Sequence, residues 1–311
     1  MGDPPADFTR AVPDGGYAWW YVDAVSEDGR HGLTVIAFIG SVFSPYYARA
    51  RRGGDVRAAD HVALNVALYG PHGRWAMTER GASALGRSAT QLAIGPSHLD
   101  SDGRTLVATF DEVAVPWPRR VRGQFEVTPR IVTTADYALD DAARHHWCPR
   151  WPSADIEVTL EAPRLHWRGH AYVDHNHGAE PLEAAFTDWH WSRRVGGDEA
   201  CVRYEARRTD GSVRELGLRF TRAGETQALA AAPLQRLPPS PVWRMPRAAR
   251  SAGAAAVLRT LEDSPFYARS LVTVEEPGIG PATVVHESLS LARFRVPLVQ
   301  LMLPFRMPRR A

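Results

Sequence analysis

The stretch RVRGQFEV, from Arg120 to Val127, decides the fold class of this chain. Apolar or small residues occupy every second position, and charged or polar residues stand between them. In an extended strand, successive side chains point to opposite faces, so this period of two predicts a strand with one buried face. The positions expected to point inward are Val121, Gly123, Phe125 and Val127, and those expected to point outward are Arg122, Gln124 and Glu126.

Similar strands recur along the chain, separated by turn residues. Trp20 to Val25 and Gly32 to Phe43 flank the turn Glu27-Asp28-Gly29, and the second strand is apolar enough to be buried on both faces. His61 to Tyr69 alternates with a period of two. The segment from Val202 to Phe220 contains an Asp-Gly pair between two alternating runs, which predicts a hairpin.

Helical periodicity is scarce. Thr78 to Leu85 could form a short helix, and Pro297 to Leu303 another near the end of the chain. Many short strands with few helices predict an all-β protein made of antiparallel barrels or sandwiches.

The length of 311 residues predicts two domains, because a single core rarely serves so long a chain. A weak internal sequence repeat supports this division. Tyr17-Ala18-Trp19-Trp20 and Asp188-Trp189-His190-Trp191 each open a run of strands. We therefore expect domains at residues 1–180 and 181–311, with a boundary near Pro181. One large sandwich is the alternative.

Composition excludes several classes of protein. The net charge is +2, which gives no reason to expect binding to nucleic acid. No lysine occurs, which excludes a Schiff-base lysine and a phosphate-binding loop lysine. Cys148 and Cys201 lack metal or redox spacing and are expected to be buried thiols in a reducing compartment.

Targeting signals are absent from the sequence. Residues 1–16 lack the charged start and apolar run of a signal peptide, and no stretch approaches about 20 apolar residues. We expect a soluble or peripheral protein on the cytoplasmic side of the membrane.

The most informative stretch for function is HWRGHAYVDHNHGAEPLEAAFTDWHWSRR, from His166 to Arg194. Tyr172 and Asp174 lie two residues apart, so on a strand they project to the same face. If Trp167, Trp189 and Trp191 line the same cavity, burial would raise the pKa of Asp174 and keep its side chain protonated. The alternative is a turn-forming aspartate, since residues 174–178 are rich in loop formers.

A protonated carboxyl group in an aromatic cavity could act as a general acid on a carbon–carbon double bond. Tryptophan and tyrosine rings would then stabilise the resulting cation by about 0.5–2 kcal/mol each. Two-carboxylate glycoside hydrolysis by Asp174 and Asp188 is a weaker alternative.

The histidines of this stretch raise the question of a metal. His166, His170, His175, His177 and His190 could supply zinc ligands, but their spacing matches no known ligand pattern, so we predict no metal site. A histidine acting as a base towards water is an alternative to ordinary polar loop histidines. Neither a nucleophile elbow nor a glycine-rich phosphate loop occurs, so we also predict no cofactor.

The last segment, FRVPLVQLMLPFRMPRRA from Phe294 to Ala311, mixes apolar residues with arginines. A final helix packed on the barrel with a basic tail would explain it. The segment could also be a basic amphipathic contact with a membrane surface, through which a lipid-soluble substrate enters.

Several motifs, in the same order, make the chain resemble the carotenoid 1,2-hydratases, also called hydroxyneurosporene synthases. The resemblance covers nearly the whole chain. Its motifs are DGGYAWWYVDAVSEDG (Asp14–Gly29), LTVIAFIGSVFSPYY (Leu33–Tyr47), RHHWCPRWP (Arg144–Pro152), GHAYVDHNHGAEPLE (Gly169–Glu183), DWHWSR (Asp188–Arg193), TLEDSPFYARS (Thr260–Ser270) and LPFRMPR (Leu303–Arg309).

The resemblance implies a cofactor-independent hydratase with two lipocalin-like domains. Such an enzyme adds water to the terminal C1–C2 double bond of acyclic carotenoids such as neurosporene and lycopene. Matched to the family motif, Asp174 would be the proton donor, Tyr172 its polar neighbour and Trp147 a stabiliser of the tertiary cation. The base that takes a proton from water stays open between His175, His177 and Asp174. Trp167, Trp189 and Trp191, with His175 and His177, are expected to contact the substrate.

The same superfamily contains isomerases, cyclases and lipid-binding members. A non-catalytic carrier of a long apolar ligand is therefore the principal alternative function. The sequence predicts no particular oligomeric state.

Overall fold

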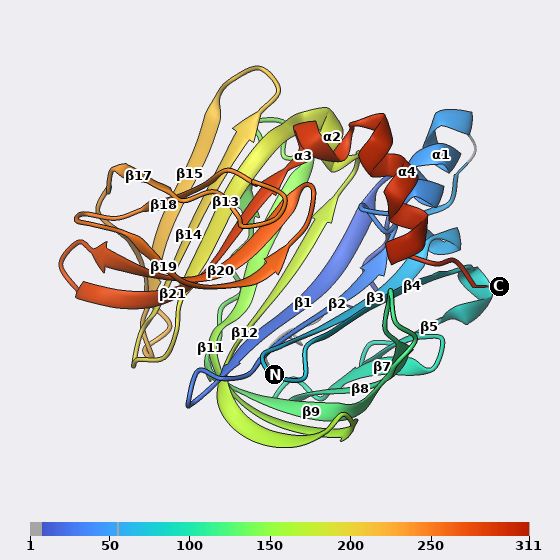
Figure 1. Cartoon of the computed structure of the whole chain (residues 1–311), viewed down its shortest axis with the longest axis horizontal. Helices are drawn as coiled ribbons and strands as arrows, with labels where there is room; N and C mark the ends of the chain where they lie inside the picture. The colour runs from blue at the N-terminus through green and yellow to red at the C-terminus, as the bar shows by residue number, and fades with distance from the viewer. Residues whose placement is uncertain (1–7, 55, 311) are drawn as a thin grey trace. The chain divides into compact units, whose positions relative to one another are not determined.

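Antiparallel β-strands dominate the computed structural model, which describes residues 8–54 and 56–310 (Figure 1). The chain divides into unit 1, which comprises Met1–Pro181 and Gln300–Ala311, and unit 2, which comprises Leu182–Val299. The all-β prediction is confirmed. Residues 1–7, part of the stretch whose composition argues against a signal peptide, lie outside the described residues.

Unit 1 contains twelve strands among its described residues, all in one antiparallel sheet. They are β1 (Tyr17–Ser26), β2 (Gly32–Ile39), β3 (Val62–Tyr69), β4 (Arg74–Arg80), β5 (Leu85–Arg87), β6 (Gln91–Ile94), β7 (Ser97–Ser101), β8 (Leu106–Val113), β9 (Arg120–Ile131), β10 (Tyr137–Ala138), β11 (His145–Ala162) and β12 (Arg164–Gly178). The first strand, β1, pairs with both β2 and β12, so strands from the two ends of the unit meet. Helix α1 (Pro45–Gly53) and the 3-10 turns Ala58–Asp60 and Ala82–Ala84 complete the unit.

The turn between β1 and β2 illustrates how local sequence sets this pairing. The Asp28 carboxylate accepts hydrogen bonds from the Ser26 hydroxyl at 2.6 Å and from the Arg30 backbone N–H at 2.9 Å. Gly29 has φ +66°, which a side chain would disfavour. The predicted turn at Glu27-Asp28-Gly29 is confirmed, and it fixes the register of the hairpin.

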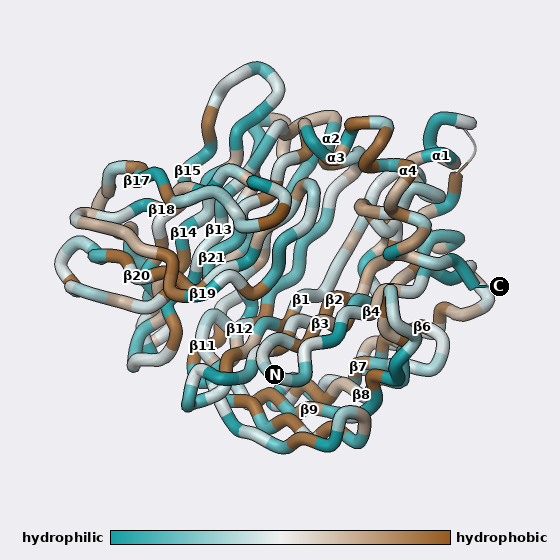
Figure 2. Tube along the Cα trace, in the orientation of Figure 1, coloured by the Kyte–Doolittle hydropathy of each residue, from teal (hydrophilic) through white to brown (hydrophobic). Residues whose placement is uncertain are grey.

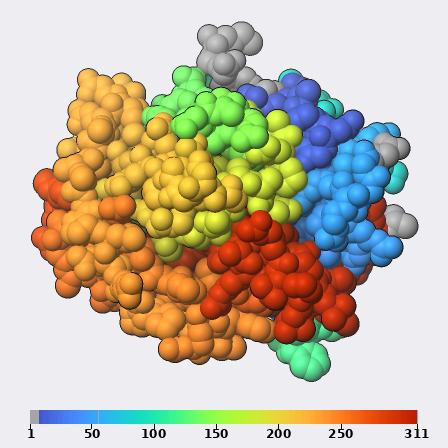
Figure 3. Space-filling view, turned by 90° about the horizontal axis from the view of Figure 1, so that it is seen from above, coloured from blue at the N-terminus to red at the C-terminus, as the bar shows by residue number. Residues whose placement is uncertain are grey.

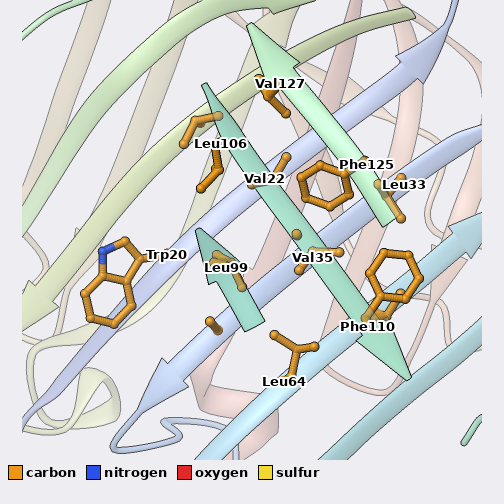
Figure 4. Packing of buried hydrophobic residues seen from close by; sticks show 14 of the residues in the cluster. Trp20, Val22, Leu33, Val35, Leu64, Leu99, Leu106, Phe110, Phe125 and Val127 are labelled. Carbon is orange, nitrogen blue, oxygen red and sulfur yellow. The ribbon is translucent and has the colours of Figure 1, made fainter. Parts of the chain in front are cut away.

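The sheet of unit 1 curls around a large apolar core. Side chains of β1–β3 and of β7–β9 point toward one another, as Figure 4 shows for Val22, Val35 and Phe125. The backbone N–H of Val115 donates to the carbonyl of Trp75 at 2.9 Å, which brings the end of β8 to the start of β4. In Figure 2, hydrophobic residues recur along β1–β3 and β9.

The alternation predicted for β9 is confirmed residue by residue. Positions 121, 123, 125 and 127 are buried, and positions 122, 124 and 126 are exposed. Burial of a side chain such as Phe125 stabilises the fold by about 1.5–3 kcal/mol. Strand β3 was predicted to alternate but is buried on both faces.

One predicted helix is wrong. Thr78 to Leu85 was expected to be helical, but β4 continues to Arg80 and only Ala82–Ala84 forms a 3-10 turn. Strand pairing overrides the local helical pattern, because Thr78 lies opposite Leu64 of β3. The predicted strand from Gly32 to Phe43 ends earlier, at Ile39, before Gly40 with φ +69°.

The described part of unit 2 contains a seven-stranded sheet and a two-stranded sheet. The strands are β13 (Phe186–Arg194), β14 (Ala200–Arg208), β15 (Val213–Phe220), β16 (Thr226–Ala228), β17 (Leu234–Leu237), β18 (Arg247–Arg250), β19 (Ala256–Asp263), β20 (Tyr267–Glu276) and β21 (Gly280–Ser290). The helices are α2 (Leu182–Ala185), α3 (Leu291–Phe294) and α4 (Pro297–Arg306), and the last continues into unit 1. The predicted hairpin is formed by β14 and β15, and the predicted helix at Pro297 is α4.

Unit 2 repeats one feature of unit 1. Its first long strand, β13, pairs with both β14 and the last strand, β21, as β1 pairs with β2 and β12. The two segments of the predicted repeat, Tyr17–Trp20 and Asp188–Trp191, thus lie on strands β1 and β13. Each of these strands pairs with the strand that follows it and with the last long strand of its unit.

Candidate functional site

The hairpin of β11 and β12, together with β1, positions the residues expected to carry chemistry. Asp174 lies opposite Tyr21 of β1, and Asn176 lies opposite Trp147 of β11. Because side chains alternate along a strand, Tyr172, Asp174 and Asn176 share one face with Trp147. We call this face of the sheet the Asp174 face.

On the Asp174 face, the three predicted catalytic residues contact one another. The Tyr172 hydroxyl donates to Oδ2 of Asp174 at 3.0 Å. The indole N–H of Trp147 lies 3.0 Å from the Tyr172 hydroxyl oxygen and 3.1 Å from Oδ2 of Asp174. Asn176 donates through Nδ2 to Oδ1 of Asp174 at 2.8 Å. Both carboxyl oxygens are therefore held by neutral donors.

These side chains are buried. Tyr172 and Trp147 have 0% exposure and Asp174 has 5%. Burial raises the pKa of the Tyr172 phenol well above its usual value, and the neighbouring Asp174 raises this pKa further. The phenol therefore keeps its proton and acts as a donor at neutral pH. At Asp174, low polarity favours the protonated carboxyl, while the three donors favour the carboxylate.

A β-bulge lies next to this cluster. The ladder between β11 and β12 shifts register between Pro149 and Trp151 and again between Trp151 and Ala154. Pro149 lies opposite Asp174 and has no N–H to give to the ladder. A bulge commonly redirects side chains next to a functional site, and here it follows directly after Trp147.

Aromatic rings cover much of the Asp174 face. The rings of Tyr21 and Tyr172 lie 6.2 Å apart, edge to face, and those of Tyr137 and Trp147 lie 5.5 Å apart. Trp19, which pairs in register with Asn176, packs against Phe38 and stacks on Tyr17. Of the aromatic residues expected beside Asp174, Tyr172 and Trp147 lie on this face, and the other rings on it come mainly from β1.

Three predicted substrate contacts lie on the opposite face of the same strand. Trp167 belongs to the apolar core of unit 1, and His175 stacks on Trp20 of that core at 4.8 Å. Nδ1 of His175 donates to the Trp19 carbonyl at 3.0 Å. His177 lies beside His175, with ring centres 5.5 Å apart. The structure therefore does not bring Trp167, His175 or His177 together with Asp174.

Burial also keeps these two histidines neutral. It holds the pKa of His175 well below the ordinary value, and His177 beside it lowers this pKa further. Burial and then the charge of Arg10 lower the pKa of His177 to about 4.

The other two predicted contacts, Trp189 and Trp191, belong to β13 of unit 2. Trp189 packs against Phe186 and Tyr204. Trp191 lines a pocket within unit 2, together with His190, His286, Glu205 and other residues of that unit.

Three further residues on the Asp174 face were not predicted from the sequence. Asn176 holds Oδ1 of Asp174, and Asp23, fully buried, lies opposite Tyr172 on β1. The signal for Asp23 was available, because the tripeptide Tyr-Val-Asp occurs both at 21–23 and at 172–174. The two copies pair with each other in antiparallel register.

The third missed residue is His145, two positions before Trp147. Its Nδ1 lies 3.0 Å from the Tyr17 hydroxyl, and its Nε2 lies 3.3 Å from Glu180. Gly178 makes room for this contact, since a Cβ there would lie 2.5 Å from the Tyr17 ring and 2.8 Å from Nδ1 of His145. In the sequence, Gly178 is marked only as the last residue of a stretch rich in loop formers.

Two further properties concern metals and membranes. Among the described residues, Asp136, Cys148 and His177 form a group whose ligand atoms lie close enough to hold a metal ion. Within the same residues, no helix is both long and apolar enough to cross a membrane.

Comparison with known proteins identifies relatives over nearly the whole chain. The family model of the carotenoid hydratase CrtC matches residues 35–311. The chain is 50% identical over 305 residues to the acyclic carotenoid 1,2-hydratase of Thiocapsa roseopersicina, covering 97% of this chain and 75% of that protein. It is 49% identical over 310 residues to the protein of the same name from Rubrivivax gelatinosus, covering 98% and 76%.

Solved structures share the fold at low sequence identity. A putative AttH from Nitrosomonas europaea matches with a TM-score of 0.62 and 14% identity, covering 90% of this chain and 93% of that chain. Kievitone hydratase from Nectria haematococca matches with a TM-score of 0.55 and 9% identity, covering 94% of each chain. These similarities concern the fold alone.

Proposed function

Since this chain belongs to the carotenoid hydratase family, we propose that it is an enzyme that adds water to the terminal C1–C2 double bond of acyclic carotenoids. The product is a tertiary alcohol, and neurosporene and lycopene are the expected kind of substrate. The observation that carries the proposal on the chemical side is the buried cluster of Asp174, Tyr172 and Trp147.

The reaction begins with a proton transfer from the Asp174 carboxyl group to C2. The π electrons form the new C–H bond, and the positive charge develops on C1, which is tertiary. The faces of Trp147 and Tyr172 stabilise this cation by about 0.5–2 kcal/mol each. Water then attacks C1, and the oxonium ion loses one proton.

Tyr172, Trp147 and Asn176 orient the acid. All three contact the carboxyl oxygens, so the acidic proton is confined to a narrow range of positions. The same donors stabilise the carboxylate that forms when the proton leaves. This sequence of steps uses no cofactor and no metal.

The proton released by water returns to Asp174. His175 and His177, the other groups considered for this role, project to the opposite face of β12. Asp23 is the second carboxyl group on the Asp174 face, and residues diagonal across two antiparallel strands lie roughly 7–8 Å apart. Asp174 remains the preferred base. Its carboxylate forms when the proton passes to C2, and C2 is bonded to C1, the carbon that water attacks.

Peripheral membrane contact would give the enzyme access to a lipid-dissolved substrate. On α4, Leu298, Leu301 and Phe305 are 65%, 68% and 79% exposed, and their spacing places them on one side of the helix. The C-terminal residues lie at the surface beside α1 (Figure 3). We assign the lipid contact to this apolar side and not to the basic residues. Arg306 lies over the Trp75 ring at 4.3 Å and Arg309 pairs with Glu79, so both arginines already have partners within the protein.

The test of the proposed function is direct. Purified protein is incubated with lycopene under nitrogen, without added cofactor, in the presence and absence of a chelator. We expect a product heavier by one water molecule under both conditions. Binding of lycopene without conversion would favour the carrier function, and a product of unchanged mass would favour an isomerase or cyclase. Loss of conversion with chelator while circular dichroism shows an unchanged fold would exclude the metal-free mechanism above.

A further inference from the structure

Three potential ligands meet on the side of the β11–β12 hairpin that faces away from Asp174. They are Asp136, just before β10, Cys148 on β11 and His177 on β12. The carboxylate oxygen, the thiol sulfur and the imidazole nitrogen all lie within 4.8 Å of one another. Cys148 is fully buried, and Asp136 is exposed enough for an ion to enter from solvent.

One imidazole nitrogen beside this group, Nε2 of His175, makes no hydrogen bond among the described residues, and the side chain of His175 is 1% exposed. Nε2 of His177 lies 3.7 Å from Oδ2 of Asp136. Because Nδ1 of His175 donates to the Trp19 carbonyl, its Nε2 carries the bare lone pair. A buried lone pair without a donor is unfavourable unless something else binds there.

From these contacts we propose that Asp136, Cys148 and His177 form a binding site for a divalent transition-metal ion of the zinc type. One carboxylate, one thiolate and one imidazole suit a borderline-soft cation, and water completes a tetrahedron. Binding replaces the thiol proton with the metal ion, and the proton goes to solvent. Burial raises the pKa of the Cys148 thiol to about 12, so the thiol is protonated in the absence of metal.

A fourth residue orients the carboxylate ligand. Nδ1 of His146 lies 2.6 Å from Oδ1 of Asp136, and its Nε2 donates to the Ala143 carbonyl at 2.8 Å. The His146 ring also stacks on His177, with ring centres 4.6 Å apart. Residues that hold ligands in this way commonly change metal affinity by about 10–100-fold.

Strand alternation links the metal site to the Asp174 face. Each ligand is the chain neighbour of a residue of that face: Cys148 follows Trp147, His177 follows Asn176, and Asp136 precedes Tyr137, which packs on Trp147. An ion held by the three ligands would therefore fix the backbone of the three segments that carry those residues. The ion would be structural and would take no part in the reaction.

The proposed ligands were not predicted from the sequence, because positions 136, 148 and 177 lie in three separate segments. No local spacing marks them, and only the pairing of β10, β11 and β12 brings them together.

The full-length protein is stripped with a chelator and then titrated with Zn²⁺ or Co²⁺ alone. We expect one equivalent bound per chain, with a near-ultraviolet thiolate-to-cobalt charge-transfer band for Co²⁺. Cys148→Ser should remove the band, whereas Cys201→Ser, which alters the other buried thiol in unit 2, should leave it intact. His146→Gln should weaken binding by about 10–100-fold.

Substoichiometric binding by the folded wild-type protein would overturn the proposal. So would a charge-transfer band that survives in Cys148→Ser or disappears in Cys201→Ser. Because the readout is metal content and an absorption band, it is independent of whether the protein hydrates carotenoids.

Discussion

Two buried carboxyl groups, one in each unit, are held by opposite kinds of partner. Asp174 of β12 accepts hydrogen bonds from neutral groups, the phenol of Tyr172, the indole of Trp147 and the amide of Asn176. Glu276 of β20 accepts from the guanidinium of Arg203, at 3.1 Å from Nε to Oε1 and 2.8 Å from Nη2 to Oε2. Their exposures are similar, 5% and 3%.

This contrast explains how one chain can use buried carboxyl groups for different purposes. A guanidinium in bidentate contact keeps a carboxylate ionised, so the pair serves structure. Asp174 has only neutral donors around it, which is consistent with the general-acid role proposed for it. Burial alone therefore does not separate the proposed acid, Asp174, from Glu276, whereas the charge of their partners does.

The largest effect is expected for Asp174→Asn. The amide cannot donate an acidic proton, so formation of the hydroxylated carotenoid should fall by about 10²–10⁴-fold. Product is quantified by liquid chromatography, and circular dichroism verifies the fold.

The matched control is Asp23→Asn, which changes the other carboxyl group on the Asp174 face. We expect a much smaller loss of activity for this variant. If Asp174→Asn keeps wild-type activity, the acid role is excluded, and if Asp23→Asn is the more damaging change, the roles must be reassigned.

Arg203→Met should act on stability and not on chemistry. It leaves the Glu276 charge buried without the guanidinium, which should lower the free energy of unfolding by about 3–5 kcal/mol. Denaturant melts give this value. Arg219→Met, which breaks the more exposed pair with Glu199, should change stability by less than about 1 kcal/mol. If both variants lose the same free energy of unfolding, the buried Arg203–Glu276 pair is no more important for stability than the exposed pair.

A smaller effect on rate is expected for Tyr172→Phe. The variant keeps the ring but loses the hydroxyl that donates to Asp174, a loss of about 1–3 kcal/mol or roughly 10–100-fold in rate. Tyr21→Phe provides the control, since this ring packs edge to face on Tyr172. The prediction fails if the Tyr21 hydroxyl proves more important for turnover than that of Tyr172.

The last effect, which is small for each pH unit, concerns pH and unit 2. Burial, and then His190, lower the pKa of His286 to about 3, far below the value of about 6.5 expected in the unfolded chain. Between these values the unfolded state binds the extra proton, so stability is lost as pH falls below about 6.5. Each pH unit in this window removes up to about 1.4 kcal/mol, and His286→Gln should flatten the slope by that amount. An unchanged slope would show that His286 titrates normally.

Local sequence patterns predicted the strands well where one face meets solvent. The alternation at Arg120–Val127 and the hairpin around Asp210-Gly211 were both confirmed. Prediction failed at Thr78–Leu85, where pairing with β3 extends the strand beyond what local propensity suggests. It also failed to show that β3 is buried on both faces, because burial of the second face depends on distant segments.

The candidate site was predicted only in part for the same reason. The spacing of Tyr172 and Asp174 on a strand is enough to place both side chains on one face, and their contact follows. The partners on neighbouring strands, Trp147 opposite Asn176 and Asp23 opposite Tyr172, depend on register. Trp167 was predicted to lie with Asp174 because the two are close in sequence. The two residues are seven positions apart on the same strand, and an odd separation places their side chains on opposite faces.

By itself, the sequence determined the fold class, the family and the shared face of Tyr172 and Asp174, because each of these depends on residues near one another along the chain or on motifs in order. Only the tertiary structure decided which rings surround Asp174, that neutral donors hold both of its oxygens, and that Asp136, Cys148 and His177 converge behind it. These features arise from strand register and from a bulge, which depend on the pairing of β10, β11 and β12 with one another and of β12 with β1, more than a hundred residues earlier in the chain.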